Sequence, residues 1–218
     1  MTRTALVEIA AGTVAMEGVL ALPPDAIGIV LFAHGSGSSR LSPRNNHVAA
    51  ALREAGIGTL LLDLLTPDED LGHAQRFAQC FDTGMLAERL GRAAAWLGTE
   101  PLTAPLSLGL FGASTGAAAA LRLAARDGSG IAAVVSRGGR PDLAGEAALA
   151  AVIAPTLLVV GGDDDAVLGL NRRAMAALRC EKELAIVPGA THLFEEPGKL
   201  EEVAELARDW FVRHFGTF

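Results

Sequence analysis

Apolar runs of strand length alternate with alanine-rich segments of helix length along this chain of 218 residues. The clearest apolar runs are GIVLFA at 28–33, LSLGLF at 106–111 and TLLVVG at 156–161. A run without polar alternation is typical of a strand that is covered on both faces, as in a parallel sheet. The repeated strand–helix alternation therefore predicts an α/β fold, in which a mostly parallel sheet carries helices on both faces.

The whole pattern begins with a hairpin that turns at Ala11-Gly12 and then continues with single strands and helices. We predict strands at 5–9, 13–20, 28–33, 57–63, 106–111, 131–136, 156–161 and 183–187. We predict helices at 45–55, 84–98, 115–126, 143–151, 168–179 and 198–215. The longest irregular stretch is 64–83, and loops of that length are often functional. No linker or repeat divides the chain, so we expect residues 1–218 to form a single domain.

Composition excludes several classes of protein. Half of the residues are hydrophobic and 20% are charged, which is typical of a globular chain. The formal charge of −7 means that the chain has no net positive charge to attract nucleic acid or an anionic membrane. We find no signal peptide and no run of about 20 apolar residues, so the default expectation is a cytoplasmic protein. Cys80 and Cys180 lack a disulfide or metal spacing and are interpreted as structural thiols.

The segment GLFGASTGAAAAL carries the sharpest chemical signal. Its Gly112-Ala113-Ser114-Thr115-Gly116 follows an apolar strand and opens a helix, which is the context that a G-x-S-x-G nucleophile elbow requires. The turn is so tight that the serine is strained and its neighbours must be small. The helix that starts there favours negative charge at its N-terminus. The alternative is a serine that only caps the helix, but the flanking strand and helix favour a nucleophile.

Two later loops supply the partners that a nucleophilic serine needs. The strand at 156–161 is followed by Asp163-Asp164-Asp165, and the strand at 183–187 is followed by Pro-Gly-Ala-Thr-His192. The order Ser, Asp, His is the order of the catalytic triad in α/β folds that carry such an elbow. Each of the two loops also leaves the carboxyl end of a strand. The pattern G-x-x-D-x-x-V from Gly161 favours Asp164 as the acid. Asp163 is the rival, and Asp165 could instead cap the next helix.

The loop after the strand at 28–33 reads His34-Gly35-Ser36-Gly37. Together with the residue after the nucleophile, such a loop supplies backbone N–H groups to an oxyanion hole, here from Ser36 and Thr115. We interpret His34 as a brace for this loop rather than as a base.

The same segment supports a rival hypothesis from another class. A strand, Gly35-x-Gly37, a helix and a strand that ends at Asp63 imitate a dinucleotide-binding βαβ unit. Arg40 stands where a third glycine would be expected, a hairpin precedes the unit, and the Ser–Asp–His order stays unexplained. For Asp63 we therefore favour a carboxylate that caps the next turn.

At these residues the chain resembles the dienelactone hydrolase-like branch of the α/β-hydrolase superfamily. The resemblance rests on FAHGSGSSRLSPRN, TLLLDLLTPDE, GLFGASTGAAAAL, SRGGRPDL, VVGGDDDAVLGLN and GATHLFEEPG. It implies an eight-stranded α/β-hydrolase fold with no metal or organic cofactor. Dienelactone hydrolases carry a cysteine nucleophile where this chain has Ser114, which points toward simple esters. Residues 137–155 have room for only a short helix, so we expect no large lid domain.

Three arginines at the predicted carboxyl edge of the sheet are candidates for substrate binding. Arg40 follows the oxyanion loop, and Arg137 and Arg140 follow the strand at 131–136. Their guanidinium groups suit a carboxylate or phosphate on the substrate. The alternative is that they pair with nearby acidic residues and brace the loops.

These observations predict a serine esterase that works through an acyl-enzyme on Ser114, with His192 as base and Asp164 as acid. Thioesterase, peptidase or dienelactone hydrolase activity with the same triad is the alternative among enzymes. A dinucleotide-binding module and a non-catalytic hydrolase fold are the alternatives outside them. The expected partner is a small-molecule ester, with no nucleic acid and no membrane, and a homodimer is the assembly left open.

Overall fold

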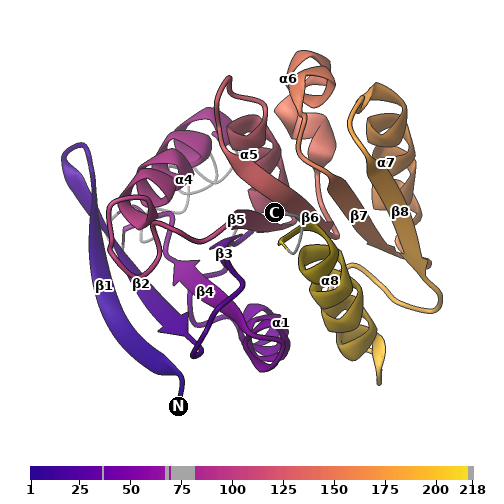
Figure 1. The fold of residues 1–218 in the computed structure, drawn as a ribbon. Coiled ribbons are helices and arrows are strands. Elements are labelled where there is room, and N and C mark those ends of the chain that lie inside the picture. The colour runs from indigo at the N-terminus through magenta and orange to yellow at the C-terminus, as the bar shows by residue number, and fades with distance from the viewer. Residues whose placement is uncertain (36, 67–68, 70–81, 216–218) are drawn as a thin grey trace.

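The structure is a computed structural model, and it describes residues 1–35, 37–66, 69 and 82–215. Across these residues one eight-stranded sheet has the order β1-β2-β4-β3-β5-β6-β7-β8 (Figure 1). The strands are β1 (Arg3–Ala11), β2 (Val14–Leu22), β3 (Gly28–Ala33), β4 (Ile57–Leu62), β5 (Leu108–Ala113), β6 (Ile131–Arg137), β7 (Thr156–Gly161) and β8 (Lys182–Val187). Each coincides with a predicted strand, and the largest difference between their ends is two residues.

From β3 onward, each strand is followed by at least one helix, as the alternating pattern predicts. In the described part of the chain, the helices include α1 (Pro43–Glu54), α4 (Thr83–Leu97), α5 (Thr115–Ala124), α6 (Glu146–Ala151), α7 (Asp165–Ala177) and α8 (Lys199–Phe215), together with the 3-10 helix η1 (Pro141–Ala144). The predicted helix at 143–151 is divided into η1 and α6. Gly145 separates them with φ 86°, a conformation that no right-handed helix accommodates.

The register of the sheet brings several strand ends to one edge. β1 and β2 form the antiparallel hairpin, and β2 is antiparallel to β4. All other neighbouring strands are parallel. The loops after β3, β5, β6, β7 and β8 therefore leave the sheet at the same carboxyl edge, which is where α/β proteins place their sites.

Helices cover both faces of the sheet (Figure 1). On one face, α4 and α5 pack through residues such as Leu90 and Leu121, and α6 and α7 belong to the same apolar cluster. On the other face, α1 and α8 pack through residues such as Leu52 and Phe211. β3, β4 and β7 are buried along their whole length, and β5 is buried at every position except its first. The continuous apolar runs thus correspond to strands covered on both sides.

Two further observations concern a lid domain and membrane-spanning helices. Between β6 and β7 the chain contains only η1 and α6, and we find no lid domain in the described part of the chain. No helix among the described residues is long and apolar enough to span a membrane.

Candidate active site

Ser114 lies in the turn between β5 and α5 and has a strained backbone. Its φ of 51° and ψ of −120° place a residue with a side chain in a region that L-amino acids rarely adopt. Glycines on both sides allow the turn. A Cβ at Gly112 would clash with the backbone of Ala117, and one at Gly116 would clash with the carbonyl oxygen of Ala33. The turn therefore has the geometry of a nucleophile elbow.

The backbone of Ser114 is fixed by the segment that follows the neighbouring strand. Its N–H donates to the carbonyl oxygen of Arg137 over 3.2 Å, and its own carbonyl oxygen accepts from the N–H of Arg140 over 3.0 Å. These bonds extend the pairing of β5 with β6 beyond the end of β5. Residues 137–140 therefore hold the strained turn in place.

His192 and Asp164 lie on the loops after β8 and β7 and are hydrogen-bonded to each other. Nδ1 of His192 lies 2.7 Å from Oδ2 of Asp164. A carboxylate only accepts, so Nδ1 carries the proton and Nε2 is left as the basic nitrogen. Asp163 is exposed, and Asp165 is the first residue of α7 rather than its cap. The hydrogen bond thus favours Asp164 over Asp163 as the acid.

The segment 137–140 also connects the histidine to the serine. A Cβ at Gly138 would lie 3.5 Å from both Nδ1 and Cε1 of His192, so the imidazole packs directly against this glycine. Arg137 and Arg140, on either side of it, hold the backbone of Ser114. The imidazole and the nucleophile turn are therefore neighbours across one short segment. Sequence reasoning did not single out Gly138, although the paired glycines in SRGGRPDL are a signal for close approach.

The loop after β3 packs directly on the nucleophile turn. A Cβ at Gly35 would lie 2.9 Å from Cβ of Ser114 and 3.1 Å from the carbonyl oxygen of Ala113. Thr115 is buried at the start of α5. Ser36, the other predicted oxyanion donor, lies outside the described residues, as do Cys80 and most of the stretch 64–83. The oxyanion hole remains a prediction that this packing favours.

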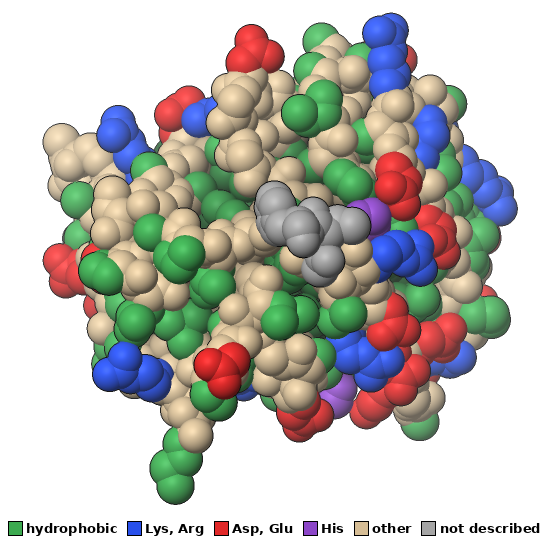
Figure 2. Space-filling model, viewed as in Figure 1, with side chains coloured by type: hydrophobic (Ala, Val, Ile, Leu, Met, Phe, Trp, Pro, Cys, Tyr) green, Lys and Arg blue, Asp and Glu red, His purple; other side chains and the backbone are tan. Residues whose placement is uncertain are grey.

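The three candidate arginines have different surroundings. Arg40 forms ion pairs with Glu17 and Asp63, and Arg140 forms two bonds of 2.8 and 2.9 Å with Asp142. The Arg140 guanidinium holds the pKa of the Asp142 carboxyl below its usual range. Figure 2 shows basic and acidic side chains interspersed on the viewed face of the molecule. These pairs favour a bracing role for Arg40 and Arg140.

Arg137 differs because it is buried without a carboxylate partner among the described residues. Only 6% of the residue is exposed, its Nη2 donates to Oδ1 of Asn45 over 3.2 Å, and its Nε has no hydrogen-bond partner. Its Cζ lies 6.0 Å from the centre of the Phe194 ring, on the loop that carries His192. Burial, and then the nearby charge of Arg44, lower the pKa of Arg137 to about 10.

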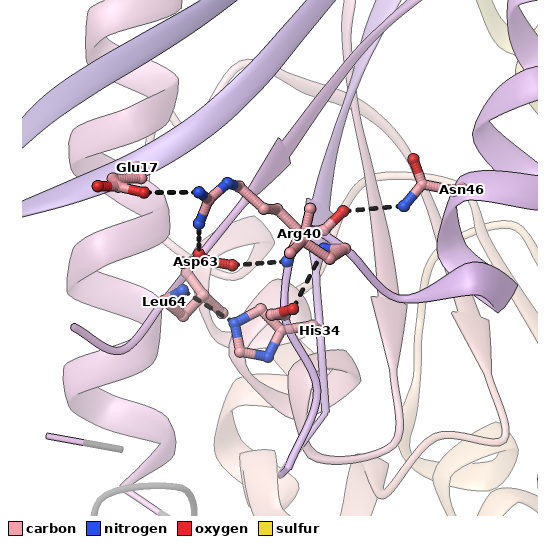
Figure 3. Close-up of polar contacts among 8 residues, drawn as sticks. Glu17, His34, Arg40, Asn46, Asp63 and Leu64 are labelled. Carbon is pink, nitrogen blue, oxygen red and sulfur yellow. Dashed lines mark hydrogen bonds and ion pairs between the residues drawn. The ribbon is translucent and has the colours of Figure 1, made fainter. Parts of the chain in front are cut away.

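Asp63 has a different role from the one that the dinucleotide-binding hypothesis requires. Its carboxylate accepts from the backbone and the side chain of Arg40 (Figure 3). It is therefore already engaged by the residue that replaces the third glycine of that motif. This contact favours the interpretation of Asp63 as a carboxylate that organises the turn after its strand. The described residues contain no group of three or more metal-ligating side chains that could hold an ion.

A mostly parallel sheet of this order, with a strained serine between a central strand and the next helix, defines an α/β hydrolase. The model of the dienelactone hydrolase family matches residues 16–218. The chain is 51% identical in sequence to dienelactone hydrolase from Anabaena variabilis. It matches the crystal structure of that protein with a TM-score of 0.94 over 98% of each chain. The chain belongs to the dienelactone hydrolase family, in agreement with the resemblance seen in its motifs.

Two further similarities are more limited. Est1E from Butyrivibrio proteoclasticus has a TM-score of 0.82 over 97% of this chain and 99% of its own, but at 16% identity it shows the fold alone. A Mycobacterium tuberculosis protein, provisionally named as a phosphoribosyl transferase, is 56% identical over 208 residues. The match covers 95% of this chain and 46% of that protein, so the chain spans about half the length of its curated relative.

Proposed function

We propose that this hydrolase cleaves carboxylic esters through an acyl-enzyme on Ser114, with His192 as general base and Asp164 as the acid behind it. The observation that carries the proposal is the 2.7 Å hydrogen bond between His192 and Asp164. It joins two loops at the edge of the sheet where the strained Ser114 lies. A serine, an imidazole and a carboxylate in this order are the components of acyl transfer by a catalytic triad.

The first half of the reaction transfers the acyl group to the enzyme. Oγ of Ser114 attacks the ester carbonyl carbon while Nε2 of His192 takes its proton, and the carbonyl oxygen becomes an oxyanion. Backbone N–H groups of Ser36 and Thr115 stabilise that oxyanion in this proposal. The carbon–oxygen bond to the alcohol then breaks, and Nε2 of His192 gives the proton to the departing alkoxide.

The second half returns the enzyme to its starting state. Nε2 of His192 takes a proton from a water molecule, whose oxygen attacks the acyl carbon. The bond between that carbon and Oγ of Ser114 breaks, and Oγ takes the proton back from Nε2. Asp164 keeps its negative charge throughout and stabilises the imidazolium that forms twice in each cycle.

The relatives support ester chemistry. The similar Anabaena protein is named as a hydrolase of dienelactone, and a lactone is an internal ester. A serine at the elbow, in place of the family's cysteine, puts simple esters ahead of dienelactone as substrates. The transferase name belongs to proteins about twice as long as this chain. The family model that matches the shared region is that of a hydrolase family.

A preference for esters with an anionic group would depend on Arg137 in this proposal. Arg40 and Arg140 already bind carboxylates of the chain, whereas the Arg137 cation lacks one among the described residues. A substrate carboxylate or phosphate would offset part of the cost of that buried charge. The test compares kcat/KM for a neutral ester and its carboxylate-bearing analogue. A ratio that Arg137→Met leaves unchanged rejects anion recognition by this residue.

The proposed function is tested with a panel of chromogenic esters, a thioester and a peptide anilide. The purified chain should hydrolyse esters faster than the thioester or the anilide, and Ser114→Ala should lower kcat by several orders of magnitude. The matched control is Ser129→Ala, a serine in the turn after α5 whose hydroxyl bonds the carbonyl oxygen of Ala124. Full ester hydrolysis by Ser114→Ala rejects the mechanism. Saturable binding of NADH without ester hydrolysis would favour the dinucleotide-binding module.

A further inference from the structure

The loop that follows β3 is anchored at both ends by the two residues that follow β4. At its start, the N–H of Leu64 donates to Nε2 of His34 over 2.9 Å. At its end, the backbone N–H of Arg40 donates to Oδ1 of Asp63 over 2.5 Å. Figure 3 shows both bonds converging on the same short stretch of chain. The first and last residues of the loop, His34 and Arg40, are thus both held by the residues that follow β4.

Asp63 itself is fixed by the sheet. Its backbone N–H donates to the carbonyl oxygen of Glu17 over 2.9 Å, which extends the pairing of β2 with β4 by one residue. Its side chain is largely buried, at 17% exposed, and its second oxygen binds Nη1 of Arg40. Both carboxylate oxygens therefore bind the same arginine, one through the backbone and one through the side chain. Such charge-assisted bonds hold geometry better than neutral ones do.

The loop that Asp63 anchors reaches the nucleophile. Gly35 lies so close to Ser114 that a Cβ would be 2.9 Å from the Cβ of the serine. The N–H of Ser38 donates to the carbonyl oxygen of Gly35 over 3.2 Å, so Gly35 is also tied to a later residue of the loop. The carbonyl oxygen of Arg40 accepts from Asn46 of α1 over 2.8 Å, so the far end of the loop is held on that side as well. A displacement of Arg40 would therefore shift the backbone beside Ser114.

We infer that Asp63 is a positioning residue for the reaction at Ser114. Its carboxylate holds the loop after β3, whose Gly35 packs against Ser114 and which supplies an oxyanion donor in the proposed function, although Asp63 touches no reacting atom. The inference rests on the proposed esterase function. It also assigns Arg40 to the protein's own architecture rather than to the substrate.

The test compares Asp63→Ala with Glu17→Gln. Asp63→Ala removes both bonds between Arg40 and the carboxylate, and we expect kcat to fall about 10- to 100-fold with KM within about twofold, because the loop that supplies an oxyanion donor in the proposed function is displaced. Glu17 is 58% exposed and binds only the Arg40 side chain, so Glu17→Gln should leave kcat within about twofold. Asp63→Asn keeps an acceptor for the Arg40 N–H and should lie between them, and it serves as the test if Asp63→Ala does not fold.

A second readout separates positioning from a general loss of structure. Phenylboronic acid forms a tetrahedral adduct on a reactive serine, and its affinity should fall in Asp63→Ala by about the same factor as kcat. Unchanged kcat and boronate affinity in a folded Asp63→Ala protein would overturn the inference. A rise in KM at constant kcat would overturn it as well, because Arg40 would then act on the substrate. A wild-type chain without ester hydrolysis dependent on Ser114 would instead reject the proposed function, and this inference with it.

Discussion

The loops that carry His192 and Asp164 and the loop after β3 reach the same edge of the sheet but are held in different ways. Backbone hydrogen bonds join the loops of the first pair. The N–H of Gly162 donates to the carbonyl oxygen of Val187 over 2.8 Å, and that of Asp163 donates to the carbonyl oxygen of Ala190 over 3.0 Å. The loop after β3 depends on the side chains of His34 and Asp63. A loop held by backbone bonds tolerates side-chain changes, whereas a loop held by side chains is sensitive to each of them.

The largest expected effect concerns the one side-chain bond of the first pair that has a chemical role. Asp164→Asn keeps the shape of the residue but favours the wrong imidazole tautomer, so kcat should fall about 10³- to 10⁴-fold. Asp163→Asn, at the exposed neighbouring position, should stay within about twofold. Steady-state hydrolysis of a short ester measures both. Equal losses in the two variants would contradict the assignment of the acid.

The backbone contact between the two loops can be broken with one methyl group. A Cβ at Gly161 would clash with the carbonyl oxygens of Ala190 and Thr191, next to His192. We expect Gly161→Ala to lower the free energy of unfolding by about 1–3 kcal/mol and to reduce kcat as well. Gly169→Ala is the control, because that glycine lies inside α7 and a Cβ there would meet only the flexible end of the Arg173 side chain, at 4.0 Å. The control should gain about 0.5–1 kcal/mol in urea unfolding, and a loss equal to that of Gly161→Ala would argue against the steric explanation.

A smaller effect is expected from an ion pair beside Leu64, one of the two residues that anchor the loop after β3. Arg89 binds Glu69 over 2.6 and 2.7 Å and the carbonyl oxygen of Leu64 over 2.5 Å. The hydrogen bonds from Arg89 lower the pKa of Glu69 from 4.5 to about 2. Because this folded pKa is depressed, the stabilisation is complete above pH 4.5 and is lost as the pH falls toward 2.

Glu69→Gln should therefore lower the free energy of unfolding by about 1 kcal/mol at neutral pH, a figure discounted because the pair is partly open to solvent. The difference between wild type and variant should close between pH 4.5 and 2, as followed by urea unfolding at each pH. A difference that persists unchanged at pH 2 would mean that packing, and not the charge of Glu69, stabilises the region.

The smallest effect is expected at the partly exposed pair of Arg140 and Asp142, whose side chains are 34% and 29% exposed. Arg140→Ala removes this pair but keeps the backbone N–H that holds Ser114. Unfolding should change by no more than about 1 kcal/mol, and the ratio of kcat/KM between anionic and neutral esters should not change. A selective loss of anionic ester hydrolysis would return Arg140 to the substrate site.

The fold could be predicted further from the sequence than the site could. Hydrophobic periodicity is local, so all eight strands are predicted within two residues of their ends. The predicted start of α7 is three residues late, because the run Asp163–Asp165 resembles a loop although its last residue already opens the helix. The order of Ser114, Asp164 and His192 indicated the loops that meet. The partner of Arg40 could not be predicted, because Asp63 lies 23 residues away and only the sheet brings it near. Of the three candidate arginines, only Arg137 is buried. This difference could not be predicted either, because it depends on how the loops pack in three dimensions.

The central claim is that Ser114 is a nucleophile activated by the His192–Asp164 pair. Its most direct test is peptide mapping by mass spectrometry after treatment with a serine-directed fluorophosphonate. We expect a single adduct on the peptide that contains Ser114, formed rapidly in the wild type, much more slowly in His192→Ala and not at all in Ser114→Ala. An adduct on a different residue, or labelling that His192→Ala leaves at the wild-type rate, would contradict the account.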